Sequence, residues 1–224
     1  APSVRIVEAV ETEYLGKLDV YVPKLNHLSL WYPHFEQQRR TQGGELWFYT
    51  CCHPTGVFPN RFLDQPLIKT RILQWYNWRY DLSGYLHWGL NFWDADPFHS
   101  PGPDSLPPGD CWIVYPGAEG PLSSLRWEAL RDGFEDYEYL WLLTDLRRLV
   151  AEKLGVPVSG FDPGARSDEL ARQLVPTMVD YTRDPAQITE VQVLMAMMAI
   201  KGIYAEYGVC LLYTSDAADD LLCV

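Results

Sequence analysis

The sequence predicts an α/β protein in which parallel strands alternate with helices, followed by a largely helical C-terminal region. In the first half of the chain, short runs of β-branched and aromatic residues recur between segments of helical periodicity. From Leu122 onward the strand signals stop, and apolar residues repeat every three or four positions. The chain has 224 residues, of which 47% are hydrophobic, so it can form a sizeable core.

The strand signals in the first half are runs rich in Val, Ile, Tyr, Phe and Trp, bounded by Gly, Pro or Asn. The expected strands are Ser3–Ala9, Leu18–Val22, Glu45–Cys52 and Gly84–Trp93, with a short extra strand at Cys111–Tyr115. Helices are expected between them at Asn26–Arg40, interrupted by Pro33 and closed by Gly43 and Gly44, and at Asp64–Tyr80. Because helices connect these strands, neighbouring strands should be parallel, with right-handed crossovers.

Three helices are expected after residue 122. Ser123 or Ser124 caps the first, which ends before Gly155. Its apolar stripe comprises Trp127, Leu130, Phe134, Tyr137, Leu140 and Trp141. The second helix covers about Ser167–Tyr181. The third starts at the cap Asp184 with Pro185 in its first turn and Gln187 closing a capping box, and its apolar residues are Val191, Leu194, Met195 and Met198.

Composition narrows the classes of partner. The formal net charge is −12, which disfavours nucleic acid and anionic membranes, because phosphate binding needs a basic patch. No apolar run is long enough for a membrane span. The five Cys and five His residues lack metal-binding spacing, so neither a zinc site nor a disulfide scaffold is expected. The aromatic fraction of 14%, with nine Trp and fourteen Tyr, suits either an aromatic core or a cleft that stacks on sugars.

Candidate site residues follow from the rule that parallel sheets bind ligands at the carboxyl ends of their strands. Side-chain alternation places Glu45, Trp47, Tyr49 and Cys51 on one face of their strand, the inner one, and Leu46, Phe48 and Thr50 on the helix-covered face. The residues that gather at the strand ends and on the following loops are Tyr49, His53, Trp88, Asn91, Trp93, Asp94, Asp96 and Tyr115. Trp and Tyr rings beside Asn and Asp are what a sugar site needs, although a well-packed aromatic rim is an alternative interpretation.

Other reactive residue types favour structural interpretations. Cys51 and His53 are two positions apart on one strand, which does not aim a base at a thiol, so a buried Cys is the better interpretation. Arg131 and Glu135 are four positions apart on the long helix and should form a solvated or partly buried ion pair.

The chain resembles the C-terminal half of glycoside hydrolase family 123 catalytic domains. The resemblance rests on the segment from Glu45 to Pro54, on Pro59-Asn60, Arg71 and Trp75, and on the run from Gly84 to Trp93. It continues through Tyr115-Pro-Gly117 and the long motif from Ser124 to Leu140. It implies the last four strands of a (β/α)8 barrel acting on N-acetyl-β-galactosaminides, with a carbohydrate substrate that contains an N-acetylhexosamine and no cofactor.

The implied mechanism is retaining and substrate-assisted, so that the 2-acetamido oxygen of the sugar attacks the anomeric carbon. One carboxylate orients the acetamido group and a neighbouring Glu protonates the leaving oxygen, an exception to the usual two-carboxylate scheme. The family's adjacent Asp-Glu pair lies on an earlier barrel strand. Here the adjacent Glu135 and Asp136 lie on an expected helix instead, so no catalytic residue is assigned to this chain. A non-catalytic carbohydrate-binding barrel and a purely structural α/β domain are the alternatives.

The expected organisation has three parts. Residues 1–120 form the C-terminal half of the glycoside-hydrolase-like barrel, and residues 121–209 form the closing helix and a helical region. Residues 210–224, which begin Cys-Leu-Leu-Tyr-Thr-Ser-Asp, resemble the in-frame translation of a transposase-based sequencing adapter and are expected not to be native. The chain also does not begin with Met, so we expect it to start inside a longer protein.

Overall fold

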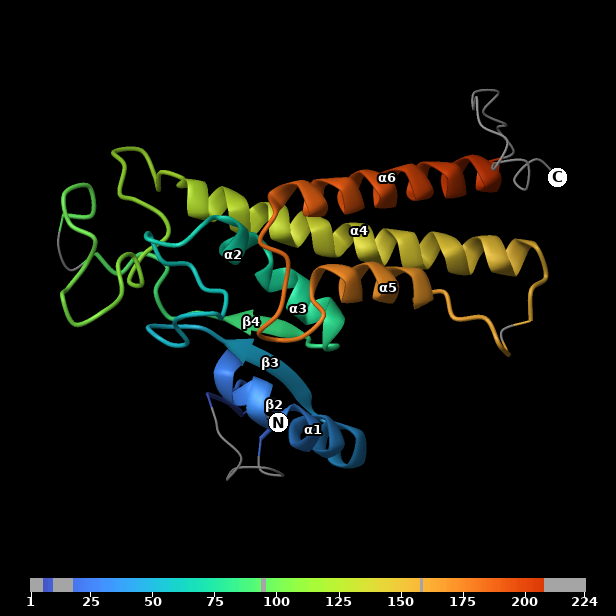
Figure 1. The fold of residues 1–224 in the computed structure, drawn as a ribbon, viewed down its shortest axis with the longest axis horizontal. Helices are drawn as coiled ribbons and strands as arrows, with labels where there is room; N and C mark the ends of the chain where they lie inside the picture. Colours follow the sequence, from blue (N-terminus) through green and yellow to red (C-terminus); the bar gives the residue numbers. More distant parts are fainter. Residues whose placement is uncertain (1–5, 10–17, 94–95, 158, 208–224) are drawn as a thin grey trace.

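The computed structural model describes residues 6–9, 18–93, 96–157 and 159–207, with side chains up to residue 198. It is a mixed α/β structure with one parallel sheet beside a layer of long helices (Figure 1). The expected adapter-derived segment 210–224 lies outside the described residues. Within the described part, no helix is sufficiently long and apolar to span a lipid bilayer.

The sheet has four parallel strands in chain order. They are β1 (Val7–Glu8), β2 (Val20–Tyr21), β3 (Glu45–Tyr49) and β4 (Gly84–Leu86). The prediction of parallel neighbours is therefore confirmed, but the strands are shorter than expected. After Leu86 the chain leaves the ladder, and the expected strand Cys111–Tyr115 forms only two isolated antiparallel bridges, Asn91 with Trp112 and Tyr115 with Leu122.

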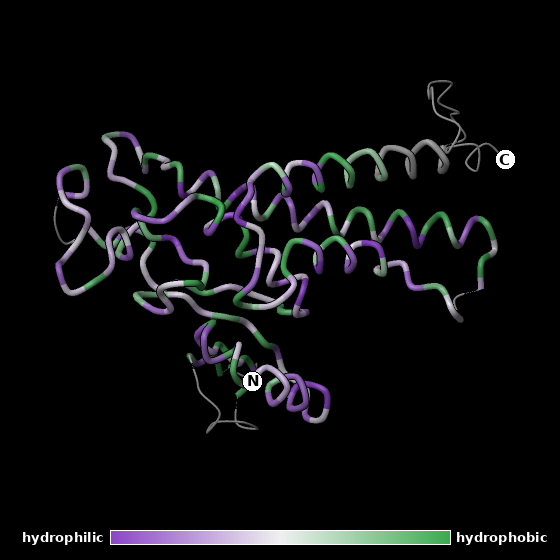
Figure 2. The backbone as a smooth tube through the Cα atoms, in the orientation of Figure 1, coloured by the Kyte–Doolittle hydropathy of each residue, from purple (hydrophilic) through white to green (hydrophobic). Residues whose placement is uncertain are grey.

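Helices α1 (Leu25–Gln42), α2 (Ile68–Arg71) and α3 (Leu73–Arg79) pack near the sheet and bury its apolar residues. The expected interruption of α1 at Pro33 is wrong, because the helix continues through it. Proline removes a single backbone donor, and Leu28 and Phe35, buried on either side of it, hold the helix in place. The C-terminal turns of α1 are hydrophilic (Figure 2). Gly43, at φ 77°, ends the helix as expected and donates to the Arg39 carbonyl.

The long helix α4 (Leu125–Lys153) packs across α2 and α3, and Ser124 caps it by accepting from the Trp127 N–H. Two residues of the predicted stripe, Leu130 and Leu140, are buried as expected. Trp127, Phe134 and Trp141 are instead exposed, and Leu143 and Leu146 are buried outside the predicted stripe. Gly133 explains the rotation. A Cβ at this position would lie 2.3 Å from the Arg71 carbonyl oxygen, so the two helices meet closely at the glycine.

Helices α5 (Ala165–Leu174) and α6 (Pro185–Tyr207) lie beside α4 (Figure 1). The expected helix to Tyr181 ends at Leu174, because Pro176 disfavours helical geometry at Val175. Asp184 caps α6 through its bond from the Ala186 N–H (3.0 Å). The predicted capping box is wrong: Thr182 donates to Gln187 (2.7 Å) and accepts from the Asp184 N–H (3.1 Å), and so it occupies both groups.

Candidate functional site

The inner face of the sheet is built by strand alternation, as predicted. In β3, Leu46 and Phe48 are buried under helices, whereas Glu45, Trp47 and Tyr49 are half-buried on the other face. Trp47 donates its indole N–H to Glu45 (2.9 Å). Its ring lies against Gly84 of the neighbouring strand, where a Cβ would come within 2.3 Å of the indole. Only glycine at this position lets the Trp47 ring approach the backbone of β4.

The loop after β3 is fixed by one buried amide. Asn60 donates its side-chain N–H groups to the carbonyls of Cys51 (2.8 Å) and Pro54 (3.1 Å). Thr70 in α2 in turn donates to the Asn60 carbonyl (3.3 Å), which ties the loop to the helix. These bonds hold His53 at the surface and leave Cys51 buried, with its thiol 3.4 Å from the His53 carbonyl oxygen. Cys51 therefore has the structural role that its position predicted.

Two buried arginines hold the second long loop in place. Arg126, in the first turn of α4, donates to the carbonyls of Arg61 (2.6 Å), Gly109 (2.8 Å) and Trp112 (2.7 Å). Arg61 donates to the Gly89 carbonyl (2.5 Å), beyond the end of β4. Burial lowers the pKa of both guanidinium groups, but arginine remains charged in proteins. The loop order thus depends on side-chain donors to backbone acceptors.

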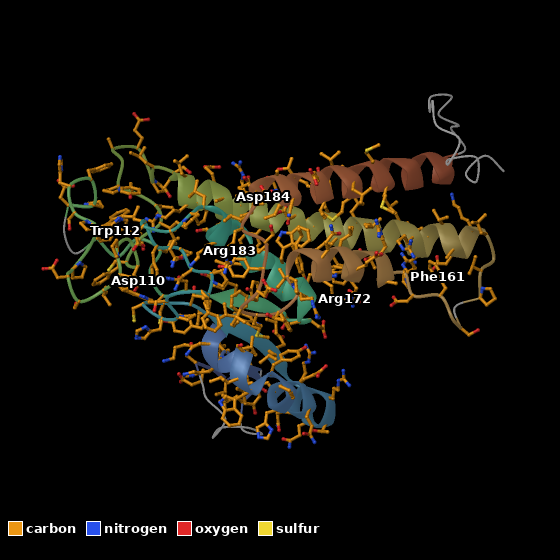
Figure 3. The ribbon with its side chains drawn as sticks, viewed as in Figure 1. Asp110, Trp112, Phe161, Arg172, Arg183 and Asp184 are labelled. Carbon is orange, nitrogen blue, oxygen red and sulfur yellow. The ribbon has the colours of Figure 1, made fainter. Side chains whose placement is uncertain are left out.

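A buried carboxylate lies where these loops meet the end of β4. Asp110 accepts a hydrogen bond from the Trp88 indole N–H (2.9 Å), and its second oxygen is 3.4 Å from Nε2 of His87. Figure 3 shows Asp110 and Trp112 among the loops, at the opposite end of the molecule from Phe161. We name Tyr49, His87, Trp88 and Asp110 the strand-end cluster.

The ionisation states in the strand-end cluster follow from burial and from Asp110. Burial lowers the pKa of His87 to about 4, and the hydrogen bond to Asp110 offsets this only in part, so His87 is neutral at pH 7. Nδ1 of His87 accepts from the Gly89 N–H (3.0 Å), which leaves the proton on Nε2, the atom that faces Asp110. Burial, reinforced by nearby Cys51 and Asp110, raises the pKa of Tyr49. At neutral pH the His87 imidazole and the Tyr49 hydroxyl are therefore both uncharged.

Comparison with known proteins supplies the family. The model of the glycoside hydrolase 123 catalytic domain matches residues 1–143. The chain belongs to this family. A family 123 glycoside hydrolase from Clostridium perfringens, whose structure concerns glycolipid glycan hydrolysis, superposes with a TM-score of 0.59 at 18% sequence identity. At that identity the superposition speaks for the fold alone. It covers 92% of this chain and 36% of that one, so the chain spans about a third of its solved relative.

A second match concerns the C-terminal segment. Residues 162–215 match the model of the malonate decarboxylase α subunit, transporter. An acetyl-S-ACP:malonate ACP transferase from Malonomonas rubra is 76% identical over 29 residues, which are 13% of this chain and 5% of that protein. The matched share is far too small to carry that protein's activity to this chain. The family-model match over residues 162–215 does not overlap the glycoside hydrolase match, which ends at residue 143.

Within the glycoside hydrolase 123 chain, the predicted site residues take different positions. Tyr49 and Trp88 belong to the strand-end cluster, and Trp93 donates to the Val114 carbonyl (3.0 Å) from the loop beyond β4. Asn91 pairs through its backbone with Trp112, and Tyr115 packs against the Phe98 ring with centroids 5.5 Å apart. His53 is exposed, and Asp94 lies outside the described residues.

Sequence reasoning missed the buried polar residues that organise the site. These are Asp110 and His87 near the end of β4 and Arg126 in α4, none of which was among the candidate site residues. A usable signal existed for Asp110, which directly precedes an apolar run after a long Pro/Gly loop. Arg126 offered no such signal, because the sequence does not distinguish a buried from a solvated arginine in a helix that carries charged residues on every face.

Two further observations limit the nature and the location of the site. In the described part of the chain, no three His, Cys, Asp or Glu side chains are grouped to hold a metal ion. A shallow hollow of about 380 Å³ lies on α4 and receives no residue from the strand ends. Its lining residues are Arg131, Phe134, Glu135, Glu138, Tyr139 and Leu142. This hollow lacks the convergent loops of the strand-end region, so we place the candidate site at the strand ends.

Proposed function

We propose that this chain is part of a retaining, substrate-assisted glycoside hydrolase that cleaves β-N-acetylgalactosaminides, and that it supplies walls of the sugar site. One observation carries the proposal: the Trp88 ring is 40% exposed at the carboxyl end of a parallel sheet while Asp110 holds its N–H. We also propose that residues 1–120 are the C-terminal half of a (β/α)8 barrel, which residues 121–209 close. Four parallel strands in chain order support that arrangement.

The aromatic residues beyond β4 suit a pyranose. The indole N–H groups of Trp88 and Trp93 are both bonded within the protein, and Trp93 is 37% exposed. Anchoring by the N–H leaves the ring faces available for stacking on the apolar C–H face of a sugar. Exposed Asn91 and His53 can bond hydroxyl groups that lose water on binding, and Tyr115 would border the same region.

The chemistry needs an adjacent pair of carboxylates, and no such pair occurs among the described residues at the strand ends. Glu135 and Asp136 are adjacent but lie on α4, and Asp136 is buried in an ion pair with Arg71 (2.8 Å). Glu135 is exposed and pairs with Arg131. In the proposed mechanism, a carboxylate from another barrel strand orients the 2-acetamido group, whose oxygen attacks the anomeric carbon. A neighbouring Glu protonates the departing glycosidic oxygen, so the sugar itself is the nucleophile.

The test compares binding and turnover. The 224-residue chain is titrated with N-acetylgalactosamine and with galactose while tryptophan fluorescence is followed, and it is incubated with an aryl N-acetyl-β-galactosaminide. We expect saturable binding of the acetamido sugar, weaker binding of galactose and no aryl release. Saturable binding that Trp93→Ala leaves unchanged contradicts the assigned wall, and aryl release contradicts the assignment of the carboxylates to other strands.

The longer protein provides the second arm. There, Trp93→Ala should lower kcat/KM at least tenfold, because a lost stacking contact weakens sugar binding. Trp31→Ala, at an exposed tryptophan on α1 that stacks on His34, is the matched control. Binding without turnover in the longer protein would identify a carbohydrate-binding barrel instead of a hydrolase.

A further inference from the structure

The side chain of Asp110 has so far been assigned no catalytic or binding role. Its carboxylate is fully buried, although it comes from a loop rich in Pro and Gly. Burying a carboxylate is unfavourable unless polar groups surround it. Here the Trp88 indole donates to one oxygen, and Nε2 of the preceding residue, His87, lies 3.4 Å from the other. Gly89 makes the approach possible, because a Cβ there would lie 2.3 Å from the Asp110 carbonyl oxygen.

We propose that Asp110 is a positioning residue that fixes the Trp88 indole as a wall of the sugar site. The expected effect of Asp110 on sugar binding rests on the proposed function, whereas the geometry of the Asp110–Trp88 bond does not. An indole that bonds only through Nε1 can still rotate about its side-chain torsions when that bond is lost. The bond to the buried carboxylate selects one orientation, and the Phe92 ring, with its centroid 5.6 Å away, flanks the other side.

Two substitutions separate positioning from mere packing. Asp110→Asn keeps an oxygen that accepts from Trp88, whereas Asp110→Leu keeps the approximate volume and removes the acceptor. The first readout is the Trp88 indole N–H resonance, assigned by its absence in Trp88→Phe. We expect Asp110→Leu to shift this resonance upfield and Asp110→Asn to leave it hydrogen-bonded. An unshifted resonance in a folded Asp110→Leu variant overturns the proposal.

The second readout is the affinity for N-acetylgalactosamine. Asp110→Leu should raise Kd about tenfold, and Asp110→Asn should restore most of the loss, which a general loss of stability would not do. If Asp110→Leu does not fold, Asp110→Asn and Trp88→Phe still test the idea. Trp88→Phe removes the indole donor, and sugar binding is the only property that this change should weaken. A wild-type chain that binds no sugar defeats the proposed function, whereas the indole resonance still decides the positioning role.

Discussion

The loops at the strand ends and the helical layer are ordered by different forces. Between Thr50 and Arg126 little of the chain is regular, and buried Asn60, Arg61 and Arg126 donate to backbone carbonyls from distant segments. In the layer of α4, α5 and α6, the backbone satisfies itself and apolar packing joins the helices, while an ion pair ties α4 to α2. A single side chain in the loops therefore satisfies several backbone groups, whereas one in the helices acts mainly on its immediate neighbours.

The largest effect is expected for Arg126→Met. The change removes bonds to three carbonyls, one at Arg61 and two in the segment from Gly109 to Trp112, and these carbonyls are left without those donors. Charge-assisted bonds contribute roughly 1.5–3 kcal/mol each and are not additive, so the free energy of unfolding should fall by about 4 kcal/mol. Urea denaturation measures it, with Arg131→Met on the same helix as control. A fall below about 1 kcal/mol would mean that the loops are held by other contacts.

The next effect concerns the ion pair that joins α4 to α2. Asp136 is fully buried and accepts from Arg71 and from the Trp75 indole N–H (3.1 Å). Burial raises the pKa of Asp136 despite the neighbouring guanidinium, so desolvation outweighs attraction there, whereas the same pair raises the pKa of Arg71. Asp136→Leu should lower the free energy of unfolding by about 3 kcal/mol, because it leaves Arg71 buried without its partner.

The double variant, Asp136→Leu with Arg71→Met, completes the cycle. Replacing both charges with apolar groups of similar volume is often nearly neutral, so the double variant should be more stable than Asp136→Leu alone. Thermal and urea unfolding of the four proteins give the coupling. A double variant less stable than either single variant would show that the pair contributes net stability instead of mainly specificity.

These contrasts also explain what sequence could predict. Alternation in β3 and the strand order were predictable, because a period of two and short crossovers determine them locally. The rotation of α4 was not, since Gly133 meets Arg71, 62 positions earlier, and the apolar residues of α4 occur on more than one face. The strand-end aromatic residues could be placed from their position after β3 and β4. Asp110 could not, because its role depends on a loop fold that the bonds of the buried Arg61 and Arg126 define.

A pH effect distinguishes the loop region further. The pKa of His87 is lowered to about 4 from its ordinary value near 6.5. The unfolded chain therefore binds more protons than the folded chain as pH falls from 6.5 towards 4, and stability is lost across that window. The loss should reach about 2 kcal/mol between pH 7 and pH 5, by 1.4 kcal/mol for each pKa unit. The free energy of unfolding against pH measures it, with His87→Gln as the comparison.

The His87→Gln variant isolates the contribution of His87 to the pH dependence of stability. His87→Gln removes the titration while keeping an amide that can accept from Gly89, so its stability should fall less than that of the wild type between pH 7 and pH 5. His34→Gln, an exposed histidine on α1, is the matched control and should follow the wild type. Parallel curves for wild type and His87→Gln would show that the acid sensitivity comes from other groups.

The smallest effect belongs to the solvated face of α4, where ion pairs are numerous but exposed. Arg131 contacts Glu128, Asp132 (3.5 Å) and Glu135 (3.4 Å), and its side chain is 58% exposed. Exposed pairs contribute at most about 0.5 kcal/mol each and are screened by salt, so Arg131→Ala should change the free energy of unfolding by less than about 0.5 kcal/mol. A loss above 1 kcal/mol that persists in 1 M salt would instead implicate the aliphatic part of Arg131 packing beside Phe134 in the α4 hollow. Arg126 and Arg131 lie five residues apart on one helix. The ratio of their effects on the free energy of unfolding therefore separates the contribution of burial and backbone bonding from that of the number of ion pairs. This comparison is more direct than any comparison between elements.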